Sequence, residues 1–379
     1  MKIAIYHNLP SGGAKRALYE YVKRIKVKKI DLYTLSSSCE EKYLPIKKYL
    51  YNSYVYNIKI KKGFLNFLKF IYIELPKIQK KIAKDINKKK YDLVFVNHDF
   101  FTKSPYLLRY LSLPSVYLCH EPPRIFYEDM QWHISSLKNL VVNLFLIPKM
   151  IIDILNVKKA SLVITLSKYS KRTLSKIYKI KTKRVRGGVD IKYFKNLRLK
   201  RSKNLLSVGS MSKLKGYEFI IKGLSKIPKI NRPRLTIVGD GSKNVDYFQK
   251  LAFKNKVGLE IKKKISDKEL IKIYNKAFLL LYFPYKEPFG LVALEAMACG
   301  LPVLGVNEGG VKETLGKENF IIKRNINLFA NNLEKLIKKE KLVEKKRNKV
   351  RKYVEECWDW NVGAREMLNY FKSISQKTT

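Results

Sequence analysis

Two glutamates, Glu287 and Glu295, mark the stretch of the chain where residue types and spacing point most directly to chemistry. An apolar run at 278–283 precedes them, so we expect a strand that ends near Pro284, a loop that carries Glu287 and a helix that begins near Gly290. Backbone N–H groups at a helix start bind anions, and glycine there lets a phosphate approach the main chain. Glu287 would then reach the group that the phosphate carries. The two carboxylate oxygens of Glu295 suit a diol such as ribose, unless this side chain simply faces solvent.

Three further turns between a predicted strand and a predicted helix carry residues that suit an anion. Lys215 stands just before Gly216, where a helix is expected to begin, and its ammonium would neutralise a diphosphate. Gly12 and Gly13 follow the first apolar run and form a turn rich in main-chain groups, without the full G-x-G-x-x-G dinucleotide pattern. The turn at Gly239 either lines a nucleotide pocket or is only a turn.

Short apolar runs alternate with helical patterns along the chain. Ten runs are expected to be strands: 2–6, 30–35, 93–97, 115–119, 162–165, 205–208, 235–238, 259–261, 278–283 and 302–306. Helical spacing follows the first run, where Ala14, Ala17, Leu18 and Tyr21 share one face. This alternation predicts an α/β fold of two doubly wound, Rossmann-like domains, each a parallel sheet with helices on both faces.

A basic stretch without periodicity, 190–204, separates the first five strands from the second five, and we place a domain boundary there. Two such domains would face a central cleft, with ligands at the carboxyl ends of the strands. His7, His98 and His120 each follow a predicted strand of the first domain directly, which places them near that cleft. A lone histidine in this position is as often a structural residue.

The charge of the chain is its most unusual bulk property. Lys and Arg number 79 against 31 Asp and Glu, a net charge of +48, which implies an anionic partner or a coding bias toward Lys. The 46% of apolar residues excludes a disordered chain. Two apolar, lysine-bearing segments, 57–90 and 137–157, are either amphipathic surfaces for an anionic membrane or core-facing helices with a solvated lysine face. A nucleic-acid-binding protein is the remote alternative, because no RNP, KH or zinc-finger pattern appears.

The cysteines and the start of the chain bear on the cellular compartment. Cys39, Cys119, Cys299 and Cys357 include no C-x-x-C pair, so we expect reduced, buried thiols and no metal site. The first apolar run is too short for a secretory leader, and no run of about 18 apolar residues occurs. We therefore expect a cytoplasmic protein, soluble or peripheral on the cytoplasmic face of a membrane.

Taken together and in chain order, these motifs resemble glycosyltransferase family 4, the retaining, nucleotide-sugar-dependent enzymes with the GT-B fold. The resemblance covers nearly the whole chain and is densest between 205 and 315. It is carried by the Gly12-Gly13 loop, His120-Glu121-Pro122-Pro123-Arg124, Gly188-Val189-Asp190, Lys215-Gly216, Gly239-Asp240-Gly241, Glu-x7-Glu at 287–295, Gly309-Gly310-Val311-Lys312-Glu313 and Trp360. It implies an acceptor-binding domain at 1–190, a nucleotide-sugar-binding domain at 191–357 and a helix at 358–379 that crosses back to the first domain.

The resemblance also implies roles for the site residues. The catalytic set would be His120, Glu287 and Lys215, with Glu287 on the hydroxyls of the donor sugar and His120 positioning that sugar. The donor-binding set would be Gly12, Gly13, Ser210, Lys215, Gly239, Gly290, Leu291 and Glu295. Lys215 and the N–H groups near Gly290 and Leu291 would hold the diphosphate, and Glu295 the ribose. No cofactor and no divalent metal are expected.

One departure from the family pattern concerns the diphosphate. Many members carry Arg where this chain has Ser210, so a second cation is missing from its usual position. Lys213 offers a charge nearby, without the bidentate fork of Arg.

We therefore expect an enzyme that moves a hexose from GDP-mannose or a UDP-sugar to a lipid-linked or polysaccharide acceptor. A sugar-nucleotide epimerase or a phosphorylase of the same fold is the alternative.

Overall fold

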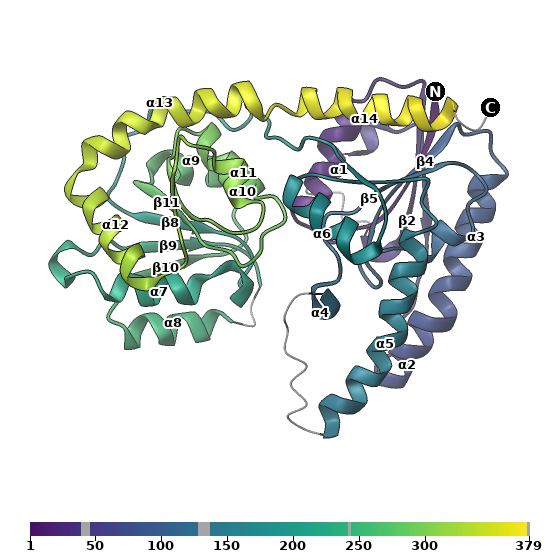
Figure 1. Cartoon of the computed structure of the whole chain (residues 1–379), viewed down its shortest axis with the longest axis horizontal. Helices are drawn as coiled ribbons and strands as arrows, with labels where there is room; N and C mark the ends of the chain where they lie inside the picture. Colours follow the sequence, from purple (N-terminus) through teal and green to yellow (C-terminus); the bar gives the residue numbers. More distant parts are fainter. Residues whose placement is uncertain (39–45, 128–136, 242–243, 377–379) are drawn as a thin grey trace. The chain divides into compact units, whose positions relative to one another are not determined.

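A computed structural model describes residues 1–38, 46–127, 137–241 and 244–376, and only the main chain of 125–126 and 137–146. Cys39 lies outside the described residues. The chain folds into two compact units, one made of Met1–Arg186 and Asn361–Thr379 and the other of Gly187–Trp360. Each unit contains one parallel sheet with helices on both faces (Figure 1).

The sheet of the first unit has seven parallel strands in the order β3-β2-β1-β4-β5-β6-β7. The strands are β1 (Lys2–Asn8), β2 (Lys29–Leu35), β3 (Asn52–Tyr56), β4 (Leu93–Asp99), β5 (Ser115–Leu118), β6 (Leu162–Thr165) and β7 (Thr182–Arg184). The helices are α1 (Gly13–Arg24), η1 (Ser36–Ser38), η2 (Ile46–Tyr49), α2 (Phe64–Lys69), the π-helical η3 (Phe70–Glu74), α3 (Leu75–Asn87), η4 (Tyr106–Arg109), α4 (Arg124–Tyr127), α5 (Leu137–Val157), α6 (Lys168–Tyr178) and α14 (Trp360–Ser375). The order reverses beside β1, and open sheets bind ligands at such a point.

The sheet of the second unit has six parallel strands in the order β10-β9-β8-β11-β12-β13. The strands are β8 (Leu205–Val208), β9 (Leu235–Val238), β10 (Leu259–Lys262), β11 (Leu279–Tyr282), β12 (Val303–Val306) and β13 (Phe320–Ile322). The helices are η5 (Lys213–Lys215), α7 (Tyr217–Ser225), η6 (Lys229–Asn231), α8 (Val245–Lys254), α9 (Asp267–Lys276), α10 (Leu291–Ala298), α11 (Val311–Leu315), α12 (Ile326–Lys338) and α13 (Glu340–Cys357).

The sequences of the central strands explain their position. Every residue of β8 and β11 is buried, because helices cover both faces and only an apolar strand satisfies both. The one polar side chain of β8, Ser207, donates to the main-chain oxygen of Leu281 at 2.9 Å. Since β8 pairs with β11 in parallel, the segments that follow the two strands leave the sheet at the same edge. These segments carry Lys215 and Glu287.

The C-terminal helix α14 packs on the first unit although it follows the second in sequence. Glu366 accepts from the main-chain N–H and from Nε of Arg186, and Tyr370 donates to the main-chain oxygen of Arg184. Phe371 packs against Phe95 of β4, with ring centres 5.2 Å apart. These contacts attach α14 to β4, to the end of β7 and to Arg186, which follows β7.

The predicted strands are all present, with ends that differ by no more than two residues, and the predicted α/β fold class is confirmed. Three strands were not predicted, namely β3, β7 and β13, and each has a single neighbour at the border of its sheet. The expectation of buried thiols holds for Cys119 and Cys299 and is wrong for Cys357, which is exposed as the last residue of α13. None of the helices in the described part of the chain is long and apolar enough to span a membrane.

Candidate active site

Lys215 and Glu287 form the centre of the candidate site in the second unit. Lys215 ends η5 and is separated from α7 by Gly216 alone, and Glu287 lies in the loop between β11 and α10. Nζ of Lys215 lies 2.8 Å from Oε2 of Glu287, and the side chains of Lys215 and Glu287 are 27% and 17% exposed. Sequence reasoning gave these residues separate partners, a diphosphate and a sugar. The structure brings them together as an ion pair that solvent still reaches.

Backbone packing holds the two loops in this arrangement. Gly216 has a φ of +74°, and a Cβ there would lie 1.9 Å from the main-chain oxygen of Phe283. The turn after β8 can therefore approach the end of β11 only because this residue has no side chain. The main-chain N–H of Tyr285 donates to the oxygen of Leu214 at 2.8 Å and fixes the same contact.

Arg324 is a positioning residue that sequence reasoning missed. Its guanidinium forms a two-bond pair with Glu308, with both N–O distances at 2.8 Å. It also donates to the main-chain oxygens of Phe283 and Pro284 and lies 3.8 Å from the ring centre of Tyr285. Arg324 thus supports the chain that leads from β11 to Glu287. No sequence signal distinguished it from the other basic residues.

The turn after β12 supports Glu287 from a second direction. The main-chain N–H of Gly310 donates to the oxygen of Glu287 at 2.7 Å. A Cβ at Gly310 would lie 2.3 Å from the oxygen of Pro288, so the two loops are in direct backbone contact. The close backbone contact between the two loops therefore explains why glycine occupies positions 309 and 310.

Helix α10 begins where the sequence predicted, with Gly290 as its N-cap residue at a φ of +110°. The first turn of a helix leaves backbone N–H groups without acceptors in the helix, and Leu291 supplies one of them. One turn further along, Glu295 is only 6% exposed, and Tyr274 donates to its Oε2 at 3.1 Å. The alternative of a solvent-facing glutamate is therefore excluded, and the assignment of Glu295 to ribose stays a prediction.

The turns after β8 and β9 pack tightly against each other. A Cβ at Gly239 would lie 1.7 Å from the oxygen of Gly209, and Met211 N–H donates to the oxygen of Asp240 at 2.9 Å. Close packing is thus a sufficient reason for glycine at 239. Ser210 is exposed in this turn, and the ammonium of Lys213 lies 4.8 Å from the ring centre of Tyr247.

In the first unit, Gly12 is the N-cap residue of α1, and Gly13 is the first residue of that helix, as the sequence predicted. Both are exposed after β1. His7 ends up buried, and its Nδ1 accepts from the N–H of Leu9 at 3.3 Å. Burial, with a smaller contribution from Lys15, lowers the His7 pKa to about 3. His7 is therefore a neutral structural residue.

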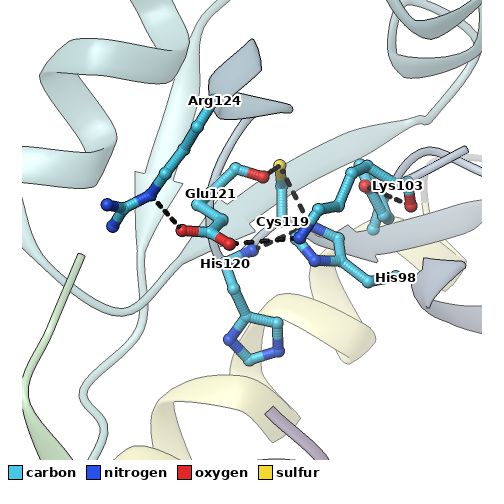
Figure 2. Close-up of polar contacts among 7 residues, drawn as sticks. His98, Lys103, Cys119, His120, Glu121 and Arg124 are labelled. Carbon is cyan, nitrogen blue, oxygen red and sulfur yellow. Dashed lines mark hydrogen bonds and ion pairs between the residues drawn. The ribbon is translucent and has the colours of Figure 1, made fainter. Parts of the chain in front are cut away.

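His120 follows β5 and is held by its neighbour on β4. The main-chain N–H of His120 donates to Nε2 of His98 at 3.2 Å, and the two rings are 5.3 Å apart in an edge-to-face arrangement (Figure 2). Because Nε2 of His98 accepts this bond, a neutral His98 carries its proton on Nδ1. Burial lowers the pKa of both rings, that of His120 to about 4, with Lys103 lowering and Glu121 raising it.

Glu121 forms the charged part of the same cluster (Figure 2). Lys103 Nζ lies 3.1 Å from Oε1 and Arg124 Nε lies 2.9 Å from Oε2. Burial raises the Glu121 pKa, but the two cations outweigh it and hold the pKa below its ordinary value. Nε2 of His120 is buried, and among the residues that the structure describes none forms a hydrogen bond with it.

The structure therefore groups the predicted residues in two places. Lys215, Glu287, Gly290, Leu291 and Glu295 belong to the second unit, and His120, Gly12 and Gly13 to the first. Over residues 1–38, 46–127, 137–241 and 244–376, no cluster of three or more His, Cys, Asp or Glu could hold a metal ion.

Comparison with known proteins identifies the second unit. Residues 189–356 match the family model for glycosyl transferases group 1. This segment contains β8 to β13 and with them Lys215, Glu287 and Glu295. The second unit is therefore a group 1 glycosyltransferase domain.

Curated relatives of this glycosyltransferase share either part or most of its length. An uncharacterized glycosyltransferase of Methanocaldococcus jannaschii is 30% identical over 179 residues, 45% of each chain. The alpha-1,3/1,6-mannosyltransferase ALG2 of Saccharomyces cerevisiae is 23% identical over 362 residues, 82% of this chain and 70% of that protein. The match thus spans about half the length of the first relative and about two thirds of the second.

Solved structures share the fold over the full length. The Anabaena protein HepE, in complex with UDP and glucose, superposes with a TM-score of 0.74 over 98% of this glycosyltransferase and 100% of HepE, at 18% identity. Sucrose-phosphate synthase from Thermosynechococcus elongatus gives a TM-score of 0.75 over 99% of both chains, at 18% identity. The predicted GT-B fold is confirmed by these matches.

Proposed function

We propose that this glycosyltransferase moves a hexose from a nucleotide diphosphate sugar to a lipid-linked or polysaccharide acceptor, with retention at the anomeric carbon. The observation that carries the proposal is the Lys215–Glu287 pair, 2.8 Å apart, in the loops that follow β8 and β11. Lys215 supplies a cation and Glu287 a hydrogen-bond acceptor for hydroxyls. A sugar diphosphate is a substrate that needs both.

The departing diphosphate determines what Lys215 does. As the bond between the anomeric carbon and the phosphate oxygen breaks, negative charge grows on the phosphate. The ammonium of Lys215 and the N–H groups at the start of α10 stabilise that charge, because they are already oriented before the reaction. The acceptor hydroxyl forms the new bond on the face that the diphosphate leaves, and its proton passes to the departing phosphate oxygen. Retention follows from this attack on the same face.

The carboxylates of Glu287 and Glu295 bind different parts of the donor in this proposal. Glu287 accepts hydrogen bonds from the sugar hydroxyls, and Glu295 from the ribose. Glu287 holds the ammonium of Lys215 while the site is empty, and it competes with the phosphate for that ammonium when the donor binds. His120 positions the sugar in this proposal, and no cofactor or divalent metal takes part.

The names of similar proteins support the choice of donor. A mannosyl donor such as GDP-mannose is supported by the name of the mannosyltransferase ALG2, and a UDP-sugar by HepE in complex with UDP and glucose. A lipid-linked acceptor would be held in a membrane, so an anionic membrane surface is part of the proposal as a partner. Nucleic acid is not.

The experiment is a donor panel with the purified chain. Thermal shift with GDP-, UDP- and ADP-sugars identifies the donor, since a ligand of the folded state raises its stability. Release of the nucleotide diphosphate is then measured with and without glycan or polyprenyl-linked acceptors. Release that depends on an acceptor supports transfer, and conversion of the donor sugar without any acceptor supports the epimerase alternative. Unchanged activity in both Glu287→Ala and Lys215→Ala would refute the site.

A further inference from the structure

The start of the long helical segment 64–87 is apolar, but its side chains are not buried. Its first part, α2, contains four apolar residues in six, and none of the six is buried. Burial begins only at Phe70 and Ile71, where η3 reaches the sheet. Phe64 is 49% exposed and Leu65 77%. Ordinary core packing, the alternative considered for this segment, therefore explains α3 and does not explain α2.

A second apolar stripe lies on α5. Ile147, Ile151 and Leu155 are spaced by four residues, which places them on one face of the helix, and each is at least 38% exposed. Tyr72 of η3 is in hydrogen-bonding contact with the main chain of Lys149 of α5, so the two helices lie side by side at this level. Figure 1 shows that α2 and the first half of α5 extend beyond the sheet of the first unit.

Lysines surround the exposed apolar residues of α2. Residues 57–90 contain eleven Lys and only two acidic residues, Glu74 and Asp85. Lys59, Lys61 and Lys62 are exposed just before the helix, and Lys69 at its end. The combination of protruding Phe and Leu with exposed lysines favours a lipid bilayer over a protein or a polysaccharide as the partner. A bilayer that contains anionic lipids offers both partners, hydrocarbon for the rings and phosphate for the ammonium groups.

We propose that α2 and the exposed face of α5 dock this chain onto an anionic lipid bilayer. Phe64, Leu65 and Phe67 insert at the level of the acyl chains, and Lys59, Lys61 and Lys62 contact the head groups. Lysine attraction alone gives adsorption that salt reverses, and the apolar residues alone give weak binding, so the two together make a stable contact. The inference rests on the proposed function only for its purpose, which is access to a lipid-linked acceptor, and binding requires no donor.

Vesicle sedimentation tests the docking with the full chain. We expect binding to vesicles of phosphatidylcholine with phosphatidylglycerol at low salt, and little binding to phosphatidylcholine alone. The double variant Phe64→Ser/Leu65→Ser should lower the partition coefficient by about tenfold or more. Its matched control is Phe253→Ser on α8, where the side chain is 88% exposed and should not matter. Lys61→Gln/Lys62→Gln should weaken binding, and Lys345→Gln/Lys349→Gln on α13 should do so less.

A fluorescent probe separates insertion from adsorption. In Leu65→Trp, the added emission should shift to the blue on anionic vesicles and be quenched by brominated acyl chains, whereas that of Phe253→Trp should not. Adsorption without quenching at 65, equal loss of binding in Phe64→Ser/Leu65→Ser and in the control Phe253→Ser, or tighter binding to RNA than to vesicles would each overturn the proposal. Failure of the docking proposal can be told apart from failure of the proposed function. Release of the nucleotide diphosphate toward a soluble acceptor should be unchanged in Phe64→Ser/Leu65→Ser.

Discussion

The ammonium of Lys215 and a carboxylate oxygen of Glu287 lie 2.8 Å apart, although 72 positions separate them in the sequence. Both side chains remain partly open to solvent, so the pair contributes little to the stability of the fold. Because the pair lies beside the start of α10, we expect it to take part in binding the donor. In the proposed function, a donor diphosphate shares the ammonium with Glu287 or displaces Glu287 from it.

This competition predicts opposite effects on nucleotide binding. Lys215→Met should weaken binding of the nucleotide diphosphate and lower kcat/KM by about 100-fold or more, because the developing charge loses its cation. Glu287→Gln should leave that binding unchanged or tighter while it slows transfer, because it frees the ammonium and removes a sugar contact. Calorimetry with the nucleotide and an assay of its release measure the two quantities.

The control for Lys215 is another lysine of the same unit. Lys222 pairs with Glu218 at 2.7 Å on the exposed face of α7. Lys222→Met should leave binding and transfer unchanged. If it reduced them as much as Lys215→Met, the effect would come from net charge and the site would be assigned wrongly.

Glu295 should be responsible for recognition of the ribose. The wild type is expected to bind the nucleotide diphosphate about tenfold or more tightly than its 2′,3′-dideoxy analogue, since a hydrogen bond to a charged group contributes about 1.5–3 kcal/mol. Glu295→Gln should reduce this preference, while its amide oxygen still accepts from Tyr274 and keeps the packing. Calorimetry with the two nucleotides gives the ratio. A preference that persists in the variant would contradict the ribose assignment.

His98 should position His120 through the main chain. His98→Ala removes the acceptor of the His120 N–H. Because one buried hydrogen bond is then lost, we expect kcat/KM for transfer to fall by about tenfold. His98→Gln offers an amide oxygen instead and should restore part of the rate. A purely structural role would lower the melting temperature in both variants and leave the kinetic constants of the folded enzyme unchanged.

The low pKa of His7 predicts how stability depends on pH. The ring takes up a proton near pH 6.5 in the unfolded chain and near pH 3 in the fold, so the unfolded state binds more protons between these values. Acidification from pH 7 to pH 4 should therefore cost stability, by at most about 1.4 kcal/mol per pH unit. His7→Gln cannot take up this proton, and the gap in unfolding free energy between wild type and variant should shrink on acidification.

Urea unfolding at several pH values measures that gap. Asp153 is also buried, and burial raises its pKa to about 6, which gives a pH dependence of opposite sign. Both proteins keep Asp153, so the comparison cancels its contribution. A gap that stayed constant from pH 7 to pH 4 would show that His7 takes up its proton equally in both states.

The local sequence was sufficient for the central strands and for the start of α10. β8, β9 and β11 are short apolar runs because both of their faces are buried, and that requirement is visible residue by residue. The border strands β3, β7 and β13 were not predicted, because a strand with a single neighbour in its sheet does not need a continuous apolar run. β3, for example, alternates exposed and half-buried residues. The place of Gly290 at the start of α10 could likewise be predicted from the neighbouring residues alone.

The contacts that define the site were decided only by the tertiary structure. The sequence named Lys215, Glu287 and Glu295, but their pairing, the burial of Glu295 and the support from Arg324 depend on residues tens of positions apart, which strand order brings together. The same holds for α2, whose apolar residues look like any core helix in the sequence. Only the fold shows that the sheet ends before it reaches them, because burial depends on what lies opposite a side chain and not on its type.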